Sequence, residues 1–279
     1  MQPLIALKQG STGTAVKVWQ QFLLQQGYTI VGTVDGDFGP NTNTATKAFQ
    51  TKHGLTADGV VGNKTYAAAM MVGFNAVLEM ADFIGIDIYH NNGTIDWSAV
   101  KADPQNIRFV YVKATEGATV QDPAYATNIH GATTAGLATG AYHFFSLTTS
   151  AADQAANFIQ QVGDTYPYQL PPAFDYEKDV SGVDIPNVIA AVSAWLTAVQ
   201  NKWGVVPIIY TSVNYWSQLG NPPGFDQYPL WLANYNKGLP ALPGNWPAWA
   251  IWQYSGSGAV SGITGEVDLN QYNVASGFL

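Results

Sequence analysis

The chain has 279 residues, of which 47% are hydrophobic and 11% are charged, and this is enough for one large or two unequal domains with a buried core. With 11 basic and 19 acidic residues the net charge is −8, which argues against a protein that binds nucleic-acid phosphates or an anionic membrane surface. Cysteine is absent, so disulfides and thiolate metal sites are excluded.

Neither a secretory signal nor a membrane-spanning helix is expected from the first 89 residues. Met1–Ile5 is not a basic region followed by an apolar core, so we expect no secretory signal peptide. The apolar stretch at residues 66–89 is interrupted by Glu79, Asp82 and Asp87, which makes it too polar for a membrane-spanning helix. A soluble protein is expected.

Residues 1–73 contain an internal repeat. Residues 35–42 and 58–65 share the pattern D-G-x-x-G-x-x-T. In each copy the glycines favour a tight turn, and Asn or Thr is positioned to cap the helix that follows. Two sets of apolar residues recur at helical spacing, namely Val16, Trp19 and Leu23, and then Ala45, Ala48 and Phe49. The segment is predicted to be a small all-α domain of three short helices, followed by a short linker at residues 74–81.

This segment resembles the type 1 family of peptidoglycan-binding domains. The matching residues are Leu7, Gly10, Gly13, Val16 and Gln20, then residues 35–42, Phe49, Gln50 and residues 54–65. The resemblance implies a module that anchors the protein to the bacterial cell wall. The residues alone indicate only a small helical domain, for which a structural spacer is the alternative, and no individual wall-binding residue is assigned.

From about residue 82 the chain alternates β-like runs with helix-like segments, as in a parallel α/β sheet or barrel. Helical segments follow the first five predicted strands, among them 151–162 and 185–203, whereas the later gaps are short and rich in Pro and Gly. We therefore expect residues 82–279 to form a TIM-like α/β barrel of the (β/α)5β3 type, with helices missing near its C-terminal end and a size below the usual ~250 residues. Strands are predicted near residues 83–89, 108–114, 138–145, 172–177, 205–211, 229–234, 248–254 and 266–270.

Acidic side chains gather at the predicted strand ends, which is where such barrels place their active sites. Asp87 lies near the end of the first predicted strand, Asp175 and Glu177 near the end of the fourth, and Asp268 near the end of the eighth. Two positions apart on a strand, Asp175 and Glu177 point to the same face. Their repulsion and partial burial would raise the pKa of one carboxyl while the other stays charged, which is the division of labour that glycoside cleavage needs.

The strand-end motifs resemble the Chalaropsis-type lysozymes of glycoside hydrolase family 25 over residues 82–273. In family order the motifs are G-I-D-I, K-A-T-E-G, G-A-Y-H-F, D-Y-E, W-x-A-N-Y, W-Q-Y-S and V-D-L-N. The resemblance implies cleavage of the β-1,4 bond between N-acetylmuramic acid and N-acetylglucosamine in peptidoglycan. It assigns the four acids, Asp87, Asp175, Glu177 and Asp268, to the catalytic site.

Roles for these residues follow from glycosidase chemistry. Glu177 is expected to be the general acid that protonates the leaving-group oxygen. Asp175 is expected to stay anionic and to stabilise an oxocarbenium-like centre, attack it directly or orient the substrate's N-acetyl group, and the sequence leaves these routes open. Asp87 and Asp268 would hold that pair in place. Substrate binding is predicted for Tyr89, Tyr142, Tyr210, Trp231, Asn234, Tyr235 and Gln253.

Other interpretations of these motifs remain open. Lys113 and Glu116 are at least as well explained by a structural ion pair as by a direct role in the site. A chitinase-like barrel would have the motif D-x-x-D-x-D-x-E, but Leu170 and Ala173 occupy the first two Asp positions. A noncatalytic wall-binding protein is the alternative from another functional class, and the presence of all four acids argues against it.

No cofactor and no metal ion is expected in this chain. The four histidines are scattered without an H-E-x-x-H motif, and two of them, His90 and His143, are predicted to form hydrogen bonds near the barrel mouth. The expected partners are peptidoglycan glycan strands, with no nucleic acid and no membrane, and we expect a monomer.

The combination of modules also predicts a biological setting. A wall-binding module joined to a muramidase, with an N-terminal Met and no signal peptide, suggests a bacteriophage endolysin. Such a protein stays in the host cytoplasm until a membrane lesion releases it to the cell wall. A secreted bacterial autolysin whose signal peptide has been removed is the alternative.

Overall fold

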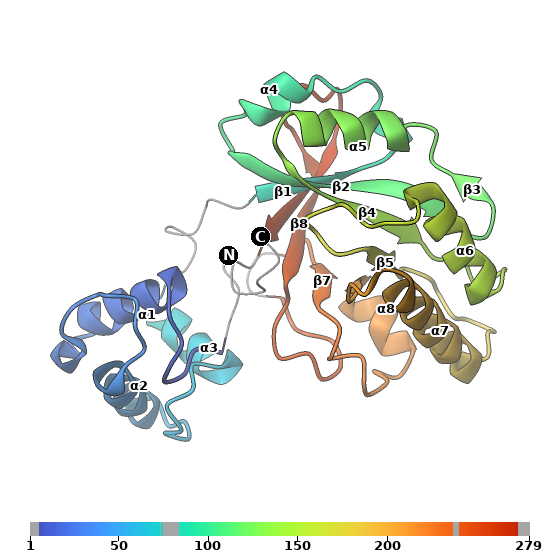
Figure 1. Cartoon of the computed structure of the whole chain (residues 1–279). Helices are drawn as coiled ribbons and strands as arrows, with labels where there is room; N and C mark the ends of the chain where they lie inside the picture. Colours follow the sequence, from blue (N-terminus) through green and yellow to red (C-terminus); the bar gives the residue numbers. More distant parts are fainter. Residues whose placement is uncertain (1–5, 73, 75–83, 237–239, 273–279) are drawn as a thin grey trace. The chain divides into compact units, whose positions relative to one another are not determined.

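The computed structural model describes residues 6–72, 74, 84–236 and 240–272. The chain divides into two compact units, residues 1–81 and 82–279, and both are drawn in Figure 1. Of the predicted linker at residues 74–81, Phe74 alone is among the described residues. No helix within the described ranges is both long enough and apolar enough to cross a membrane.

The N-terminal unit contains three helices, α1 (Thr14–Gln25), α2 (Pro40–Lys52) and α3 (Asn63–Met71), and a 3-10 turn at Thr29–Val31. The prediction of three short helices is confirmed. Trp19 lies in the core, with its ring centroid 5.6 Å from Phe49 and 5.7 Å from Tyr66. Phe74, which we placed in the linker, lies 5.5 Å from the Trp19 ring. The core of this unit therefore extends at least to Phe74.

The first copy of the sequence repeat is a turn held by a buried glutamine. The side-chain nitrogen of Gln20 in α1 donates hydrogen bonds to Asp35 at 2.8 Å and to Thr42 at 3.1 Å. Its side-chain oxygen accepts a hydrogen bond from the backbone N–H of Gly36 at 2.9 Å. The φ angle of Gly36 is 83°, a conformation that side chains with a Cβ rarely adopt.

The second copy repeats these contacts one helix later. Gln50 in α2 donates to Asp58 at 2.8 Å and to Thr65 at 3.0 Å, and it accepts from the N–H of Gly59 at 2.9 Å. The φ angle of Gly59 is 78°. The pattern D-G-x-x-G-x-x-T thus marks a loop that a glutamine of the preceding helix holds in place.

The prediction that Asn or Thr caps the helix after each repeat is wrong for α2. Its N-cap is Gly39, which makes no side-chain hydrogen bond, and Pro40 follows in the first turn, where a missing N–H costs little. Thr42 lies inside the helix, and its hydroxyl accepts the hydrogen bond from Gln20.

The second unit is a closed eight-stranded barrel with a short ninth strand, β3, attached to β2 (Figure 1). Around the barrel the order is β1-β9-β8-β7-β6-β5-β4-β2, and a β1–β2 pairing closes the ring. The strands are β1 (Ile84–Ile88), β2 (Ile107–Glu116), β3 (Val120–Gln121), β4 (Ala138–Phe144), β5 (Ala173–Asp175), β6 (Ile208–Ser212), β7 (Leu230–Ala233), β8 (Ile251–Gly258) and β9 (Val267–Tyr272). All eight predicted strands are present.

Strand direction and the length of one strand differ from the prediction. The sheet is parallel from β1 through β2, β4, β5, β6 and β7 to β8, but β9 runs antiparallel to both β8 and β1. The short loop between β8 and β9, without a crossover helix, requires this reversal because parallel neighbours need a long connection. Strand β5 ends at Asp175 and not, as predicted, at Glu177.

Five helices follow the parallel strands, as predicted: α4 (Trp97–Lys101), α5 (Tyr125–Thr134), α6 (Ala151–Val162), α7 (Ile185–Trp203) and α8 (Val213–Gln218). A 3-10 turn at His90–Asn92 precedes α4. The oxygen of Ser150 caps α6, and α7 buries Val188, Val192, Trp195, Leu196 and Val199 at helical spacing. In the described residues between β7 and β8, and between β8 and β9, there is no helix.

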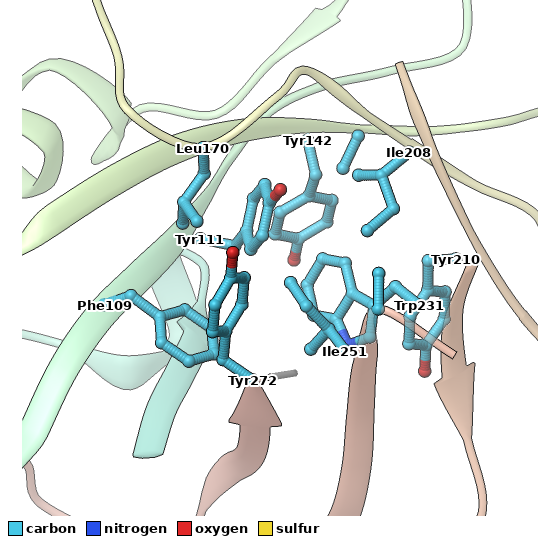
Figure 2. Close-up of a cluster of buried hydrophobic side chains, with 11 residues drawn as sticks. Phe109, Tyr111, Tyr142, Leu170, Ile208, Tyr210, Trp231, Ile251 and Tyr272 are labelled. Atoms are coloured by element: carbon cyan, nitrogen blue, oxygen red, sulfur yellow. The ribbon is translucent and has the colours of Figure 1, made fainter. Parts of the chain in front are cut away.

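Large side chains fill the barrel interior (Figure 2). Tyr111 of β2 stacks on Trp231 of β7 with ring centroids 4.5 Å apart, and Tyr210 of β6 meets the same indole edge-on at 4.9 Å. Tyr142 of β4 belongs to this cluster as well. Because the interior is packed and not hollow, a ligand can enter only above this layer.

Candidate active site

A cavity of about 340 Å³, here called the acidic pocket, lies at the carboxyl ends of the parallel barrel strands and at the amino end of the antiparallel β9. It brings together all four predicted acids and every predicted binding residue except Asn234, which lines a neighbouring cavity. Two further residues, Lys113 and Phe144, also line it. The complete lining is Asp87, Tyr89, Lys113, Tyr142, Phe144, Asp175, Glu177, Tyr210, Trp231, Tyr235, Gln253 and Asp268.

The acidic pocket rests on the barrel core. Tyr142, Tyr210 and Trp231 line the pocket and also belong to the buried cluster in Figure 2. Each of them is more than nine-tenths buried. The aromatic floor of the site is therefore the uppermost layer of a packed interior, which leaves little freedom for these side chains to move.

Two of the acids face each other across neighbouring strands. Asp87 of β1 is the direct register partner of Asp268 of β9. Burial, and then the charge of Asp268, raise the pKa of Asp87 well above its usual range. Burial also raises the pKa of Asp268. Since two opposed carboxylates repel each other, this pair favours a state in which one proton is shared.

Gln253 of β8 holds Asp87 and two tyrosines in place. Its side-chain nitrogen donates to Asp87 Oδ2 at 2.9 Å. Its side-chain oxygen accepts hydrogen bonds from the hydroxyls of Tyr210 at 2.8 Å and Tyr235 at 2.5 Å. Sugar binding by Gln253 stays a prediction, because the protein itself uses the amide oxygen and one of the two amide N–H groups. The arrangement indicates a positioning residue.

Asn270 is a residue of the site to which the sequence analysis gave no role. Its side-chain nitrogen donates to Asp87 Oδ2 at 2.7 Å, and its side-chain oxygen accepts from the indole N–H of Trp231 at 2.7 Å. It is fully buried in β9, two positions after Asp268. The alternation of side chains along a strand places it on the same face as Asp268, and this signal could have found it.

Asp175 and Glu177 line the same wall of the acidic pocket although β5 ends at Asp175. Tyr176 between them points the other way, into the core, where its ring lies 6.2 Å from Trp216. The backbone N–H of Tyr176 still donates to the carbonyl of Tyr210 at 2.9 Å, so the extended pairing persists past the strand end. This is why the two carboxyls share a face.

Burial raises the pKa of both carboxyls, and not of one alone as predicted. For Asp175 the charges of Glu177 and then Asp87 add to the effect of burial, so its pKa lies well above the usual range. The pKa of Glu177 is raised by burial and then lowered in part by Lys178. Asp175 is only 7% exposed, and its Oδ1 has no hydrogen-bond partner within the described part of the chain. An atom buried in this way can accept a hydrogen bond from water or from a ligand.

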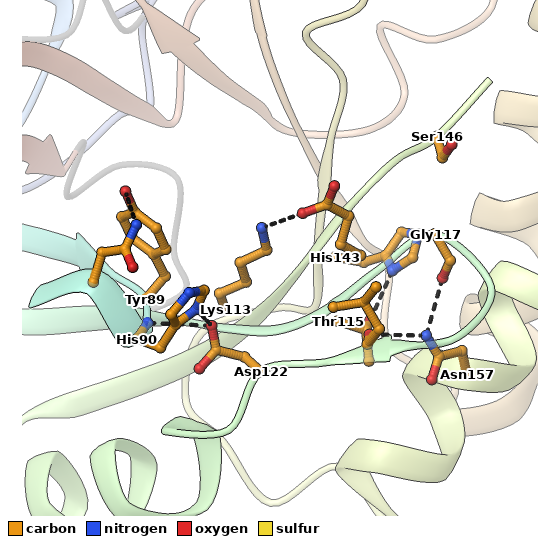
Figure 3. A network of polar contacts seen from close by, with 12 residues as sticks. Tyr89, His90, Lys113, Thr115, Gly117, Asp122, His143, Ser146 and Asn157 are labelled. Atoms are coloured by element: carbon orange, nitrogen blue, oxygen red, sulfur yellow. Dashed lines mark hydrogen bonds and ion pairs between the residues drawn. The ribbon is translucent and has the colours of Figure 1, made fainter. Parts of the chain in front are cut away.

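Two lysines, Lys113 and Lys178, lie near the acids. Lys113 of β2, labelled in Figure 3, forms an ion pair with Glu116 at 2.7 Å, so the predicted structural pair exists. Lys113 also lines the acidic pocket. The ammonium groups of Lys113 and Lys178 lie 4.7 Å and 3.8 Å from the centre of the Phe144 ring. The charges of both lysines lower the pKa of Asp175 and Glu177 and so offset part of the effect of burial.

The two histidines near the site are fixed by hydrogen bonds, as predicted (Figure 3). His90 binds Asp122 through Nδ1 at 2.8 Å. His143 is buried between Thr115 at 2.7 Å and Gln154 at 3.1 Å, and burial lowers its pKa to about 4. Within the described ranges no three His, Asp or Glu side chains are placed to hold a metal ion.

Comparison with known proteins places both units in families. Residues 86–263 match the sequence profile of the family described as Glycosyl hydrolases family 25, and residues 12–69 match that of the Putative peptidoglycan binding domain. Lysozyme M1 of Streptomyces globisporus is 31% identical over 199 residues, which are 68% of this chain and 67% of that protein.

Two further matches extend over almost the whole length of the related protein. The N,O-diacetylmuramidase of a Chalaropsis species is 33% identical over 69% of this chain and 99% of its own. The crystal structure of a bacterial lysozyme from Streptomyces coelicolor superposes with a TM-score of 0.65 at 30% identity, over 70% of this chain and 95% of that one. With its barrel, its four acids at the strand ends and these matches, the chain belongs to glycosyl hydrolase family 25.

Proposed function

We propose that this protein is a peptidoglycan hydrolase, an endo-β-1,4-N-acetylmuramidase that cleaves between N-acetylmuramic acid and N-acetylglucosamine. The observation that supports this most directly is the acidic pocket, where Asp175 and Glu177 lie beside the opposed pair of Asp87 and Asp268. Relatives named lysozyme and N,O-diacetylmuramidase support the same reaction.

Glu177 is proposed as the general acid. Its raised pKa, a direction that it shares with Asp175, suits a carboxyl that keeps its proton until a leaving group needs it, and Glu177 is the less buried of the two. The proton passes to the bridging oxygen as the bond from that oxygen to the anomeric carbon breaks. Water then adds its hydroxyl to the anomeric carbon and returns a proton to Glu177, so that the carboxyl is restored.

Asp175 is proposed to stabilise, in its ionised form, the positive charge that develops at the anomeric carbon. Its unpaired, buried Oδ1 needs a hydrogen-bond donor, and the N–H of the substrate's 2-acetamido group would supply one. That contact would orient the acetamido oxygen toward the anomeric carbon, which favours assistance by the substrate over direct attack by Asp175. Asp87 and Asp268 would set the charge around this pair.

Two kinds of side chain are proposed to bind the sugar rings. Tyr89, Tyr142, Tyr210 and Trp231 present aromatic surface to the acidic pocket, where sugar rings can stack. Tyr235 offers the most accessible ring, at 58% exposed, with its hydroxyl tied to Gln253. Asn234 lines the neighbouring cavity and would act there.

The helical unit is proposed to attach the enzyme to its insoluble substrate. Its match to a peptidoglycan-binding domain at residues 12–69 supports this role. Tethering raises the effective concentration of the barrel at the wall without any new catalytic contact. We further propose a monomer that serves as a phage endolysin and remains in the host cytoplasm before release, with a secreted autolysin as the alternative setting.

Mass spectrometry of fragments released from purified peptidoglycan tests the reaction, with Glu177→Gln run in parallel. A muramidase leaves N-acetylmuramic acid at the new reducing ends, and the variant releases no such fragments while still binding the wall. New ends of N-acetylglucosamine would indicate a glucosaminidase. Wall binding without fragments from the wild-type protein would support the noncatalytic wall-binding alternative.

A further inference from the structure

Phe144 of β4 lies between two lysines that come from the strands on either side of it. In the sheet Phe144 is the register partner of Glu116 in β2 and of Asp175 in β5. The ammonium group of Lys113, from β2, lies 4.7 Å from the centre of the Phe144 ring. That of Lys178, which follows β5, lies 3.8 Å from the same centre. One ring at the wall of the acidic pocket therefore contacts both cations.

The two lysines are not held in the same way. Lys113 has a second contact, the ion pair with Glu116 at 2.7 Å. The half-buried side chain of Lys178 forms neither an ion pair nor a hydrogen bond with any residue that the structure describes. A lysine side chain without such a partner can adopt many rotamers. The contact with the Phe144 ring is therefore what orients the ammonium group of Lys178.

We infer that Phe144 is a positioning residue whose ring holds the ammonium groups of both lysines beside Asp175 and Glu177 and so controls the charge state of these two carboxyls. This inference rests on the proposed roles of the two acids. A nearby cation favours the ionised form of a carboxyl, and its position matters most where burial favours the neutral form. The alternative is a ring that only forms an apolar wall of the pocket.

The other charged groups around the two acids act against the lysines. Glu177 and Asp87 raise the pKa of Asp175, and Asp268 raises that of Glu177. Burial acts in the same direction at both, and at Glu177 the charge of Lys178 is the largest influence that offsets it. The pKa of Glu177 should therefore rise further if Lys178 moves out into water. Burial raises the pKa of the tyrosines that face the acids and keeps them neutral; these are Tyr142, Tyr210 and Tyr235.

Titration of the full chain by NMR tests the inference without any substrate. The chain has four glutamates, so carbon-13 labelling of Glu gives four carboxyl signals, and Glu177→Gln identifies the one from Glu177. Phe144→Leu removes the ring but keeps an apolar side chain, Phe144→Tyr keeps the ring, and Lys178→Met removes the charge. The dependence of kcat/KM on pH is measured for the same variants with peptidoglycan as substrate.

In Phe144→Leu the titration midpoint of Glu177 should move to higher pH by about 0.5 units, and both limbs of the kcat/KM profile should move with it. Lys178→Met should give a similar shift. In that background Phe144→Leu should add little, because the ring acts through the cation. Phe144→Tyr should titrate like the wild type. Lys202→Met removes a lysine that pairs with Asp164, outside the acidic pocket, and is the matched control with no shift.

Three results would overturn the positioning role of Phe144. They are a Phe144→Leu variant with a lower rate but an unmoved titration, a shift as large in Phe144→Tyr as in Phe144→Leu, and shifts of Phe144→Leu and Lys178→Met that simply add. A wild-type protein that releases no fragments from peptidoglycan would contradict the muramidase proposal, whereas the titration would still decide the role of Phe144.

Discussion

The helical unit and the barrel both bury glutamines in polar networks, but only one of the two networks is complete. Gln20 and Gln50 each close a loop in which the surrounding groups are paired with one another. In the barrel, Gln253 satisfies Asp87 and two tyrosines, yet Asp175 beside them keeps a buried oxygen without a partner among the described residues. We call the first network closed, and we call the second open because a buried oxygen beside it can still accept a hydrogen bond.

The pKa shifts of the carboxyls also differ between the two networks. The backbone N–H of Asp37 and the side chain of Gln20 lower the pKa of Asp35, which lies at the surface. In the barrel, burial raises the pKa of Asp87 and Asp175 well above the usual range. The same residue type is thus held charged in one unit and driven toward its neutral form in the other, because hydrogen bonds dominate in the first and desolvation in the second.

Asp175→Asn tests the open network and should have the largest effect. The amide cannot stabilise a developing positive charge, so kcat on peptidoglycan should fall by about 10³-fold. The same change should raise the free energy of unfolding at pH 7 by about 1 kcal/mol, because the variant no longer keeps a charged carboxylate in a buried position. Fragment release and urea unfolding measure the two effects.

The sign of the pH dependence follows from the raised pKa of Asp175. A carboxyl with a raised folded pKa adds stability below its unfolded pKa of about 3.9, and that stability is lost as the pH rises through the folded value. The advantage of Asp175→Asn should therefore disappear in unfolding measured near pH 3.5. A variant less stable than the wild type at pH 7 would show that the carboxylate is paired and that the network is closed.

Gln20→Ala tests the closed network of the helical unit. It leaves the N–H of Gly36 and the hydroxyl of Thr42 without their partner and should destabilise that unit by about 2 to 3 kcal/mol. Hydrogen exchange followed by mass spectrometry should show faster exchange across α1 and α2 and unchanged protection in the barrel. Gln21→Ala is the matched control, since Gln21 is the next residue of the same helix and is exposed.

Gln253→Leu tests a residue that has features of both networks. The amide of Gln253 is hydrogen-bonded at both ends, but it lies in the site where Asp175 keeps an unpaired oxygen. We expect kcat/KM to fall about 30-fold, or about 2 kcal/mol, as Tyr210 and Tyr235 lose their acceptor. Asp87 also loses a hydrogen bond that lowers its pKa, so the acidic limb of the pH–rate profile should move to higher pH. A lower rate with an unmoved profile would indicate a packing role alone.

The sequence was sufficient for the barrel and for its acids. Apolar runs that end in polar motifs located all eight strands, since burial on both faces and a polar strand end are properties of short segments. The repeat in residues 1–73 predicted a duplicated turn, but not that Gln20 and Gln50 hold it, because those residues are distant from their loops along the chain.

Features that depend on strand pairing were harder to predict. The apolar pattern of β9 does not reveal that it runs antiparallel to β1 and so places Asp268 opposite Asp87, although the short gap before this strand was a signal for the reversal. The same holds for Asn234. Its motif groups it with Tyr235, but Asn234 lines the cavity beside the acidic pocket and not the acidic pocket itself. The sequence pattern of each strand identifies the residues that lie on one face of the barrel. The register between neighbouring strands decides which of these residues are in contact.

Glu116→Gln should have the smallest effect on stability, because the Lys113–Glu116 pair belongs neither to the networks around Gln20 and Gln50 nor to the one around Gln253. Lys113 is only 12% exposed, but Glu116 is 42% exposed, so water screens much of their attraction. Loss of the pair should lower the free energy of unfolding by about 0.5 kcal/mol at low salt, and added salt should reduce the difference further. Urea unfolding at two salt concentrations measures this. A large loss of unfolding free energy that does not change with salt would mean that Glu116 belongs to a buried network of paired groups. The closed network would then include this partly exposed residue at the edge of the site.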